Sequence, residues 1–292
     1  MSRILAALIA LVLALPLQAE QLKPLSEPSD MLPEGVLIID IRSSEDFRVG
    51  HIPGAVNAPY AQWRGPKENP GRVPSVTKLQ ALLQGLGAMM GQGILVVHEG
   101  RNATDFGSAA RVYWTLKSAG FTDLSILNGG YAAWVREGGN PETVAEAPTP
   151  SDVEIAFAGD WMIDAAGVKD VVTGASEAVL LDARPLDFFE GKKKHGAAAE
   201  AGTLAGAFNI VHSTWFAGGS PMMEAPAAMI TEIRAVAGEN AEKPLVSFCN
   251  TGHWAATNWF VASEIAGIEN VKLYPESMVG WTLLGNAVTN GG

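Results

Sequence analysis

The stretch LVSFCNTGHW at residues 245–254 contains Cys249, the only cysteine of the chain. Residues 245–248 form a largely apolar run typical of a buried strand, and residues 255–262 after the stretch predict a helix. A thiol at such a strand–loop–helix junction faces free backbone N–H groups and the positive end of the helix dipole. Because this environment favours the thiolate and can hold an anion beside it, the sequence predicts a reactive sulfur at Cys249.

An inert cysteine is the alternative. A single cysteine forms no internal disulfide, and free cysteine is often a small buried apolar residue. The glycine-containing loop that follows Cys249 favours the reactive role over the inert one.

The first 19 residues are predicted to be a signal peptide. Arg3 is followed by an apolar run over residues 4–15, a break at Pro16 and a plausible cleavage site before Glu20. A buried N-terminal helix is the alternative, and the run is too short for a typical membrane span. We therefore expect an exported, periplasmic protein that is not membrane-bound after signal removal. Its net charge of −11 argues against nucleic acid and anionic membranes as partners.

The remaining chain repeats one pattern. VLIIDIR at residues 36–42 matches AVLLDAR at 178–184, and GHIPGAVN at 50–57 matches GTLAGAFN at 202–209. The spacing between these two motifs is ten residues longer in the second copy. The duplication predicts two domains of the same fold.

The pairing continues downstream, where ILVVHE at residues 94–99 aligns with PLVSFC at 244–249, so that Glu99 takes the place of Cys249. Apolar runs alternate with helical patterns, which predicts an α/β fold in which each domain is a mainly parallel sheet covered by helices. The expected helices include residues 77–86, 111–119, 226–237 and 254–266. The expected boundaries are a first domain at residues 20–138, a linker at 139–152 and the cysteine-bearing domain at 153–292.

These motifs, in this order and followed by YPESMVGW at residues 274–281, resemble the rhodanese superfamily. The tandem arrangement with cysteine in the second copy alone is similar to the two-domain thiosulfate and 3-mercaptopyruvate sulfurtransferases. The resemblance covers essentially the whole mature chain and implies two tandem rhodanese-like domains, of which only the second is catalytic.

The resemblance also implies a reaction. The Cys249 thiolate attacks the outer sulfur of a small anionic donor, thiosulfate or 3-mercaptopyruvate, and the resulting persulfide passes its sulfur to cyanide or a thiol, including a protein thiol. No cofactor takes part. The backbone N–H groups from Asn250 to Ala255 are expected to bind the anionic persulfide, and Gly252 permits the tight curvature of this loop.

The side chains of the loop leave the donor open. Thiosulfate-preferring members carry cations here and mercaptopyruvate-preferring members carry small residues, whereas this loop has neutral Asn250 and Thr251. We expect His253 to assist a proton transfer or present a positive charge. Trp254 is expected to narrow the pocket or recognise a larger donor.

Two further groups of residues are candidates. Arg184 is predicted to bind the acid group of the donor, with an ion pair to Asp182 as the alternative, and Asp182 is predicted to be structural. The inserted run Lys192–His195 either steers anions to the site or is a solvated loop.

Three other classes of protein are alternatives. A cysteine-dependent phosphatase is not favoured, because no arginine lies between Cys249 and Ala255. A sulfur carrier that hands its persulfide to a partner without turnover, and a binding protein with an inert cysteine, stay open. Five scattered histidines and one cysteine give no metal-binding pattern.

Overall fold

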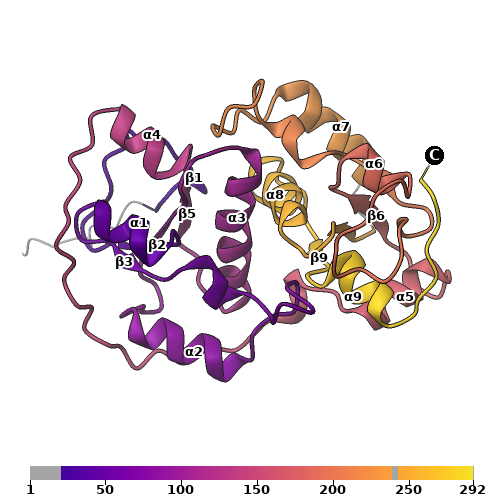
Figure 1. Cartoon of the computed structure of the whole chain (residues 1–292), viewed down its shortest axis with the longest axis horizontal. Helices are drawn as coiled ribbons and strands as arrows, with labels where there is room; N and C mark the ends of the chain where they lie inside the picture. Colours follow the sequence, from indigo (N-terminus) through magenta and orange to yellow (C-terminus); the bar gives the residue numbers. More distant parts are fainter. Residues whose placement is uncertain (1–20, 239–242, 292) are drawn as a thin grey trace, which may run out of the picture.

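A computed structural model describes residues 21–238 and 243–291, so the predicted signal peptide lies outside the described residues. The chain forms two α/β halves (Figure 1). The sheet of the first half has the strand order β1-β5-β4-β2-β3, and every neighbouring pair is parallel. Its strands are β1 (Leu25–Ser26), β2 (Leu37–Asp40), β3 (Val56–Asn57), β4 (Ile94–Val97) and β5 (Leu124–Leu127).

The sheet of the second half repeats this topology. Its order β7-β6-β8-β9 matches β3-β2-β4-β5, and its pairs are also parallel. Its strands are β6 (Val179–Asp182), β7 (Phe208–Asn209), β8 (Leu245–Phe248) and β9 (Val271–Leu273). The predicted α/β class, with two mainly parallel sheets, is confirmed.

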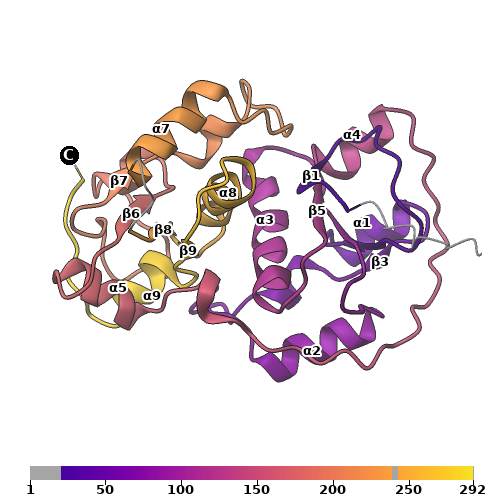
Figure 2. The same cartoon turned by 180° about the vertical axis from the view of Figure 1, so that it is seen from behind.

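Helices pack against both sheets (Figures 1 and 2). The first half contains α1 (Ser44–Val49), α2 (Val76–Gly85), α3 (Ala103–Ser118) and α4 (Gly130–Arg136). The second half contains α5 (Ala165–Val172), α6 (Leu186–Phe189), α7 (Ala227–Ala237), α8 (Trp254–Phe260) and α9 (Ser277–Leu283). Within the described ranges, none of the helices has the length and apolar character that crossing a bilayer requires.

Helix α3 corrects one predicted boundary. The expected helix at 111–119 begins at Ala103 instead, because the Asn102 side chain accepts the N–H groups of Thr104 and Asp105 and caps the first turn. The start of the helix was not predicted because polar residues in its first turn interrupt the apolar periodicity.

A buried lock holds the carboxyl end of the central strands in both halves. Arg184 donates to both carboxylate oxygens of Asp182 at 2.6–3.1 Å and to the Gly202 carbonyl at 2.8 Å. Asn209 Nδ2 then donates to the carbonyls of Asp182 and Arg184. The first half makes the same contacts with Asp40, Arg42, Gly50 and Asn57. The repeated Asp-x-Arg motif is therefore a structural element of the fold.

The two halves meet where α3 lies beside α8 (Figures 1 and 2). Phe106 packs edge-on against Phe216 and Phe260, and these side chains belong to one continuous apolar core. At the other end of α3, Tyr113 and Lys117 both bind the Glu264 carboxylate, at 2.8 and 2.7 Å. This packing fixes the first half against the loop that contains Cys249.

The close approach of α3 depends on Gly107. A Cβ atom there would lie 2.8 Å from the His253 ring and 2.9 Å from the His253 carbonyl oxygen. We expect Gly107→Ala to lower the free energy of unfolding by about 1–3 kcal/mol, measured by urea denaturation. Gly85→Ala is the matched control, because a Cβ at that exposed helical position meets open space and should stabilise by about 0.5–1 kcal/mol. Equal effects of the two substitutions would contradict this account of the interface.

Candidate active site

Cys249 follows the last residue of β8 and lies at the boundary between the two halves. Its side chain is 1% exposed and lines a pocket of about 510 Å³. Both halves contribute to this pocket, which is lined by Tyr60, Ala61, Arg64, Gly65, Pro70, Thr104, His195, Cys249, Asn250, Thr251, His253 and Trp254. Of the predicted binding residues, the structure brings Asn250, Thr251, His253 and Trp254 together beside the sulfur.

The start of α9 clamps the cysteine loop. The Ser277 hydroxyl accepts the N–H groups of Cys249 and Gly252 at 3.0 and 3.1 Å, and donates to the Tyr274 carbonyl. The N–H group of Met278 donates to the Cys249 carbonyl at 3.0 Å. Ser277 is fully buried and has a left-handed φ of 51°, a conformation that the surrounding bonds hold in place.

Gly252 makes the sharp bend of the loop, as the sequence predicted. Its φ is 68°, and a Cβ atom there would meet the Arg111 guanidinium and the Pro275 carbonyl. Arg111 reaches this point from α3, is fully buried, and donates to the carbonyls of Gly71, Gly252 and Pro275. The bend of the loop is thus shaped by a side chain of the other half.

The bend leaves several backbone donors free. Because Ser277 takes the N–H groups of Cys249 and Gly252, these two are not available to an anion. Within the described part of the chain, the backbone N–H groups of Asn250, Thr251, His253, Trp254 and Ala255 have no hydrogen-bond acceptor. They are the donors that an anionic sulfur can use.

His253 joins the two halves as a neutral ring. Its Nε2 is hydrogen-bonded to the Thr104 carbonyl and must donate, so Nδ1 accepts the Tyr60 hydroxyl at 2.9 Å. The Tyr60 oxygen in turn accepts from Arg64 at 2.7 Å. Burial, followed by the positive charge of Arg64, lowers the pKa of His253 to about 4. The positive charge expected for His253 is therefore absent at neutral pH, and both nitrogens are occupied.

Arg184 does not lie in the pocket. Its guanidinium binds Asp182 and the Gly202 carbonyl, it is 1% exposed, and it is not among the residues that line the pocket. The donor-binding role predicted for Arg184 does not fit this placement, whereas the alternative ion pair with Asp182 does. The same lock in the half without a cysteine explains why an arginine recurs there.

The inserted basic run places one residue in the pocket. Lys192 pairs with Glu190 and Lys193 pairs with Asp187, while Lys194 donates to a backbone carbonyl. His195 lines the pocket, and burial followed by the charge of Arg64 lowers its pKa. Lys192 and Lys193 are thus paired with carboxylates at the surface, and none of the three lysines lines the pocket.

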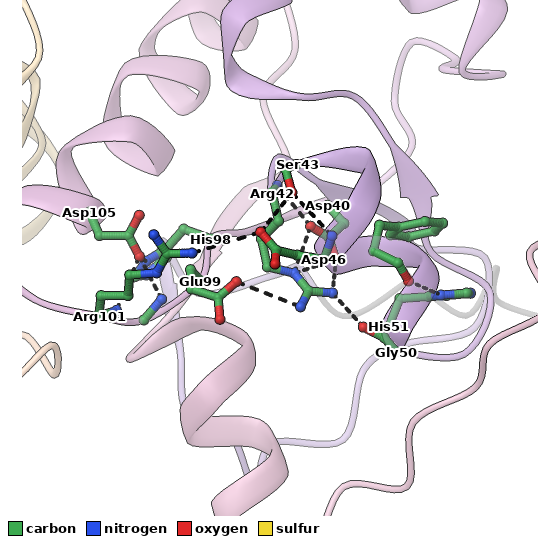
Figure 3. Close-up of polar contacts among 12 residues, drawn as sticks. Asp40, Arg42, Ser43, Asp46, Gly50, His51, His98, Glu99, Arg101 and Asp105 are labelled. Carbon is green, nitrogen blue, oxygen red and sulfur yellow. Dashed lines mark hydrogen bonds and ion pairs between the residues drawn. The ribbon is translucent and has the colours of Figure 1, made fainter.

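The equivalent position in the first half is occupied by Glu99 (Figure 3). Its carboxylate lies 3.7 Å from Arg42 Nη1 and lines a second pocket of about 400 Å³, and burial raises its pKa. Beside it, the Asp105 carboxylate accepts from the Gly100 N–H and contacts His98 Nδ1. These side chains form no metal-binding cluster, and none was found elsewhere in the described ranges.

Sequence reasoning missed the pocket residues that come from the first half. Tyr60, Arg64 and Thr104 approach Cys249 only through the packing of α3 on α8. They lie about 150–190 positions away in the chain, and no local motif marks them.

The neutral state of His253 has a consequence for stability. Since its pKa falls from 6.5 in the unfolded chain to about 4 in the folded one, the unfolded chain binds more protons between these values. The free energy of unfolding should therefore rise as the pH increases from 4 to 6.5. His253 accounts for at most about 3 kcal/mol of this rise. Urea denaturation at several pH values should give a shallower rise for His253→Gln. Parallel curves for the two proteins would contradict the assignment.

Comparison with known proteins places these features in a family. The model of the rhodanese-like domain matches residues 19–137 and again residues 164–284. A thiosulfate sulfurtransferase of Pseudomonas aeruginosa is 29% identical over 262 residues, which cover 87% of this chain and 92% of the relative. A 3-mercaptopyruvate sulfurtransferase of Escherichia coli is 26% identical, with 83% and 84% covered.

Solved structures show the same fold. The anaerobic ergothioneine biosynthesis enzyme of Chlorobium limicola, in complex with trimethyl histidine, superposes with a TM-score of 0.75 at 19% identity, covering 92% of this chain and 70% of the other. At this identity the likeness concerns the fold alone. The resemblance inferred from the sequence motifs is confirmed, and the chain belongs to the rhodanese family as a tandem of two rhodanese-like domains.

Proposed function

We propose that this protein is a sulfurtransferase that moves a sulfane sulfur from a small anionic donor to a thiophilic acceptor through a persulfide on Cys249. The Cys249 thiolate attacks the outer sulfur of thiosulfate or the thiol sulfur of 3-mercaptopyruvate, forming an S–S bond. The S–S bond of thiosulfate, or the C–S bond of mercaptopyruvate, breaks and sulfite or pyruvate leaves; the carbanion equivalent of pyruvate takes up a proton. Cyanide or a thiol then attacks the outer persulfide sulfur and restores the thiolate.

The observation that carries the proposal is the position of Cys249 in its loop. The sulfur lines a pocket, and the loop around it offers five backbone N–H groups without an acceptor in the described ranges. Such donors stabilise the negative charge that the sulfur carries as thiolate and as persulfide. The names of the relatives agree with this chemistry.

The first domain has no equivalent nucleophile in the proposal. Glu99 forms no persulfide, and its carboxylate faces Arg42 of its own domain. The proposed role of the first domain is to close the pocket over Cys249, to which it contributes Tyr60, Arg64 and Thr104.

The experiment that tests the proposal is intact mass spectrometry after incubation with thiosulfate and, separately, with 3-mercaptopyruvate. We expect the protein to gain one sulfur atom, which cyanide removes, and turnover in Cys249→Ser to fall by about 1,000-fold or more. Glu99→Gln is the matched control and should keep both properties. Undiminished turnover in Cys249→Ser would exclude the mechanism.

The same measurement separates the alternatives. A stable persulfide without turnover towards cyanide or small thiols would indicate a sulfur carrier that needs a protein partner. Absence of a persulfide, together with slow alkylation of Cys249 at neutral pH, would indicate an inert cysteine and exclude both forms of sulfur transfer.

Export to the periplasm is a second part of the proposal and rests on the sequence of residues 1–19. When residues 1–292 are expressed in a bacterial host, we expect the protein to be recovered from the periplasmic fraction in a form that begins at Glu20. A chain that lacks residues 2–19 should stay in the cytoplasm. Equal distribution of the two chains would contradict the signal-peptide assignment.

A further inference from the structure

The pocket beside Cys249 contains one permanent charge. Among the residues that line it, Arg64 carries a positive charge at neutral pH and no carboxylate is present. Both histidines of the pocket, His195 and His253, have a lowered pKa and favour their neutral form. An anion entering a protein of net charge −11 therefore meets its attraction at Arg64.

The other cations near the site are already committed. Arg184 is locked to Asp182, and Lys192 and Lys193 pair with surface carboxylates. Arg111 is sealed behind the loop by three backbone carbonyls and does not line the pocket. Arg64 is the cation that remains for a ligand among these.

Arg64 keeps part of its guanidinium free. Nε donates to the Pro70 carbonyl at 2.7 Å, Nη1 to the Tyr60 hydroxyl at 2.7 Å and Nη2 to the Thr251 carbonyl at 3.1 Å. These contacts use three of the five N–H donors of a guanidinium. In the described part of the chain, no partner occurs for the remaining N–H group on each Nη atom. The bond to Thr251 holds the cation two residues from Cys249.

The positive charges of Arg64 and Arg111 repel each other, and the carboxylate that partly offsets this repulsion at Arg111 is that of Glu276. Neither Arg64 nor Arg111 forms a salt bridge with any carboxylate in the described ranges. Burial, followed by the charge of Arg64, lowers the pKa of Arg111 to about 10. An anion bound at Arg64 would reduce this repulsion.

We propose that Arg64, supplied by the first domain, binds the acid group of the sulfur donor and orients its sulfur towards Cys249. The inference rests on the proposed function for the identity of the donor, but not for the recognition of an anion. A guanidinium fork matches a carboxylate or a sulfonate with two parallel hydrogen bonds. Arg64 of the first domain thus binds the donor, and Cys249 of the second domain attacks its sulfur. The cysteine loop therefore needs no cationic side chain of its own.

Alkylation of Cys249 by two matched reagents tests this recognition. The thiolate displaces iodide from the carbon of iodoacetate or iodoacetamide and forms a thioether, and iodide leaves into solution. Only iodoacetate carries a carboxylate. We expect the rate constant for iodoacetate divided by that for iodoacetamide to fall by about tenfold in Arg64→Gln. The ratio should fall by less in Arg64→Lys, because lysine keeps the positive charge but lacks the two parallel N–H donors of a guanidinium. Arg136→Gln, at an exposed position on α4, is the control and should leave the ratio unchanged.

The outcomes separate this inference from the proposed function. An unchanged ratio in Arg64→Gln, or a parallel fall in both rates, would overturn the role of Arg64, since the latter indicates a disturbed loop. A lowered ratio in a protein that forms no persulfide would support anion binding by Arg64 and contradict sulfur transfer from thiosulfate and 3-mercaptopyruvate. If Arg64→Gln does not fold, judged by circular dichroism, the ratio in Arg64→Lys decides. With a sulfur donor, the KM of Arg64→Gln should rise by about tenfold while kcat changes little.

Discussion

The structure of the site depends on a loop that is held from two sides. Ser277 of the same domain fixes the N–H groups of Cys249 and Gly252, and Arg111 of the other domain reaches the bend at Gly252. With these contacts in place, the other N–H groups of the loop stay free of internal acceptors in the described ranges. The arrangement of N–H donors around the sulfur therefore depends on both domains, because Arg111, one of the two residues that hold the loop, comes from the first domain.

Comparison of the two halves distinguishes the residues that maintain the fold from the residue that the proposed chemistry requires. Both halves keep the lock of aspartate, arginine and asparagine at the carboxyl ends of their central strands. The strand end beside the lock differs, with Cys249 in one half and Glu99, paired with Arg42, in the other (Figure 3). The first half, which has Glu99 in place of the cysteine, contributes Tyr60, Arg64 and Thr104 to the pocket of the second.

The sequence predicted the features that short patterns encode. Apolar runs of strand length and the matching motifs at residues 36–57 and 178–209 predicted two parallel-sheet domains, and a lone cysteine before a glycine bend indicated the candidate site. It did not predict which arginine faces the pocket. Arg184 belongs to the repeated Asp-x-Arg motif, but its guanidinium is bound to Asp182. Arg64, by contrast, donates to the carbonyl of Thr251, which lies 187 positions away in the chain. Likewise, the lowered pKa of His253 arises from burial between domains, which no local pattern records.

We expect a sulfur atom bound to Cys249 to lie in a pocket closed by both domains. A crystal structure of the wild-type protein after exposure to thiosulfate tests this claim most directly. We expect electron density for a second sulfur on Cys249 Sγ, surrounded by the N–H groups of residues 250, 251 and 253–255 and facing Arg64. An unmodified Cys249, with density for the donor at another place on the protein, would contradict it.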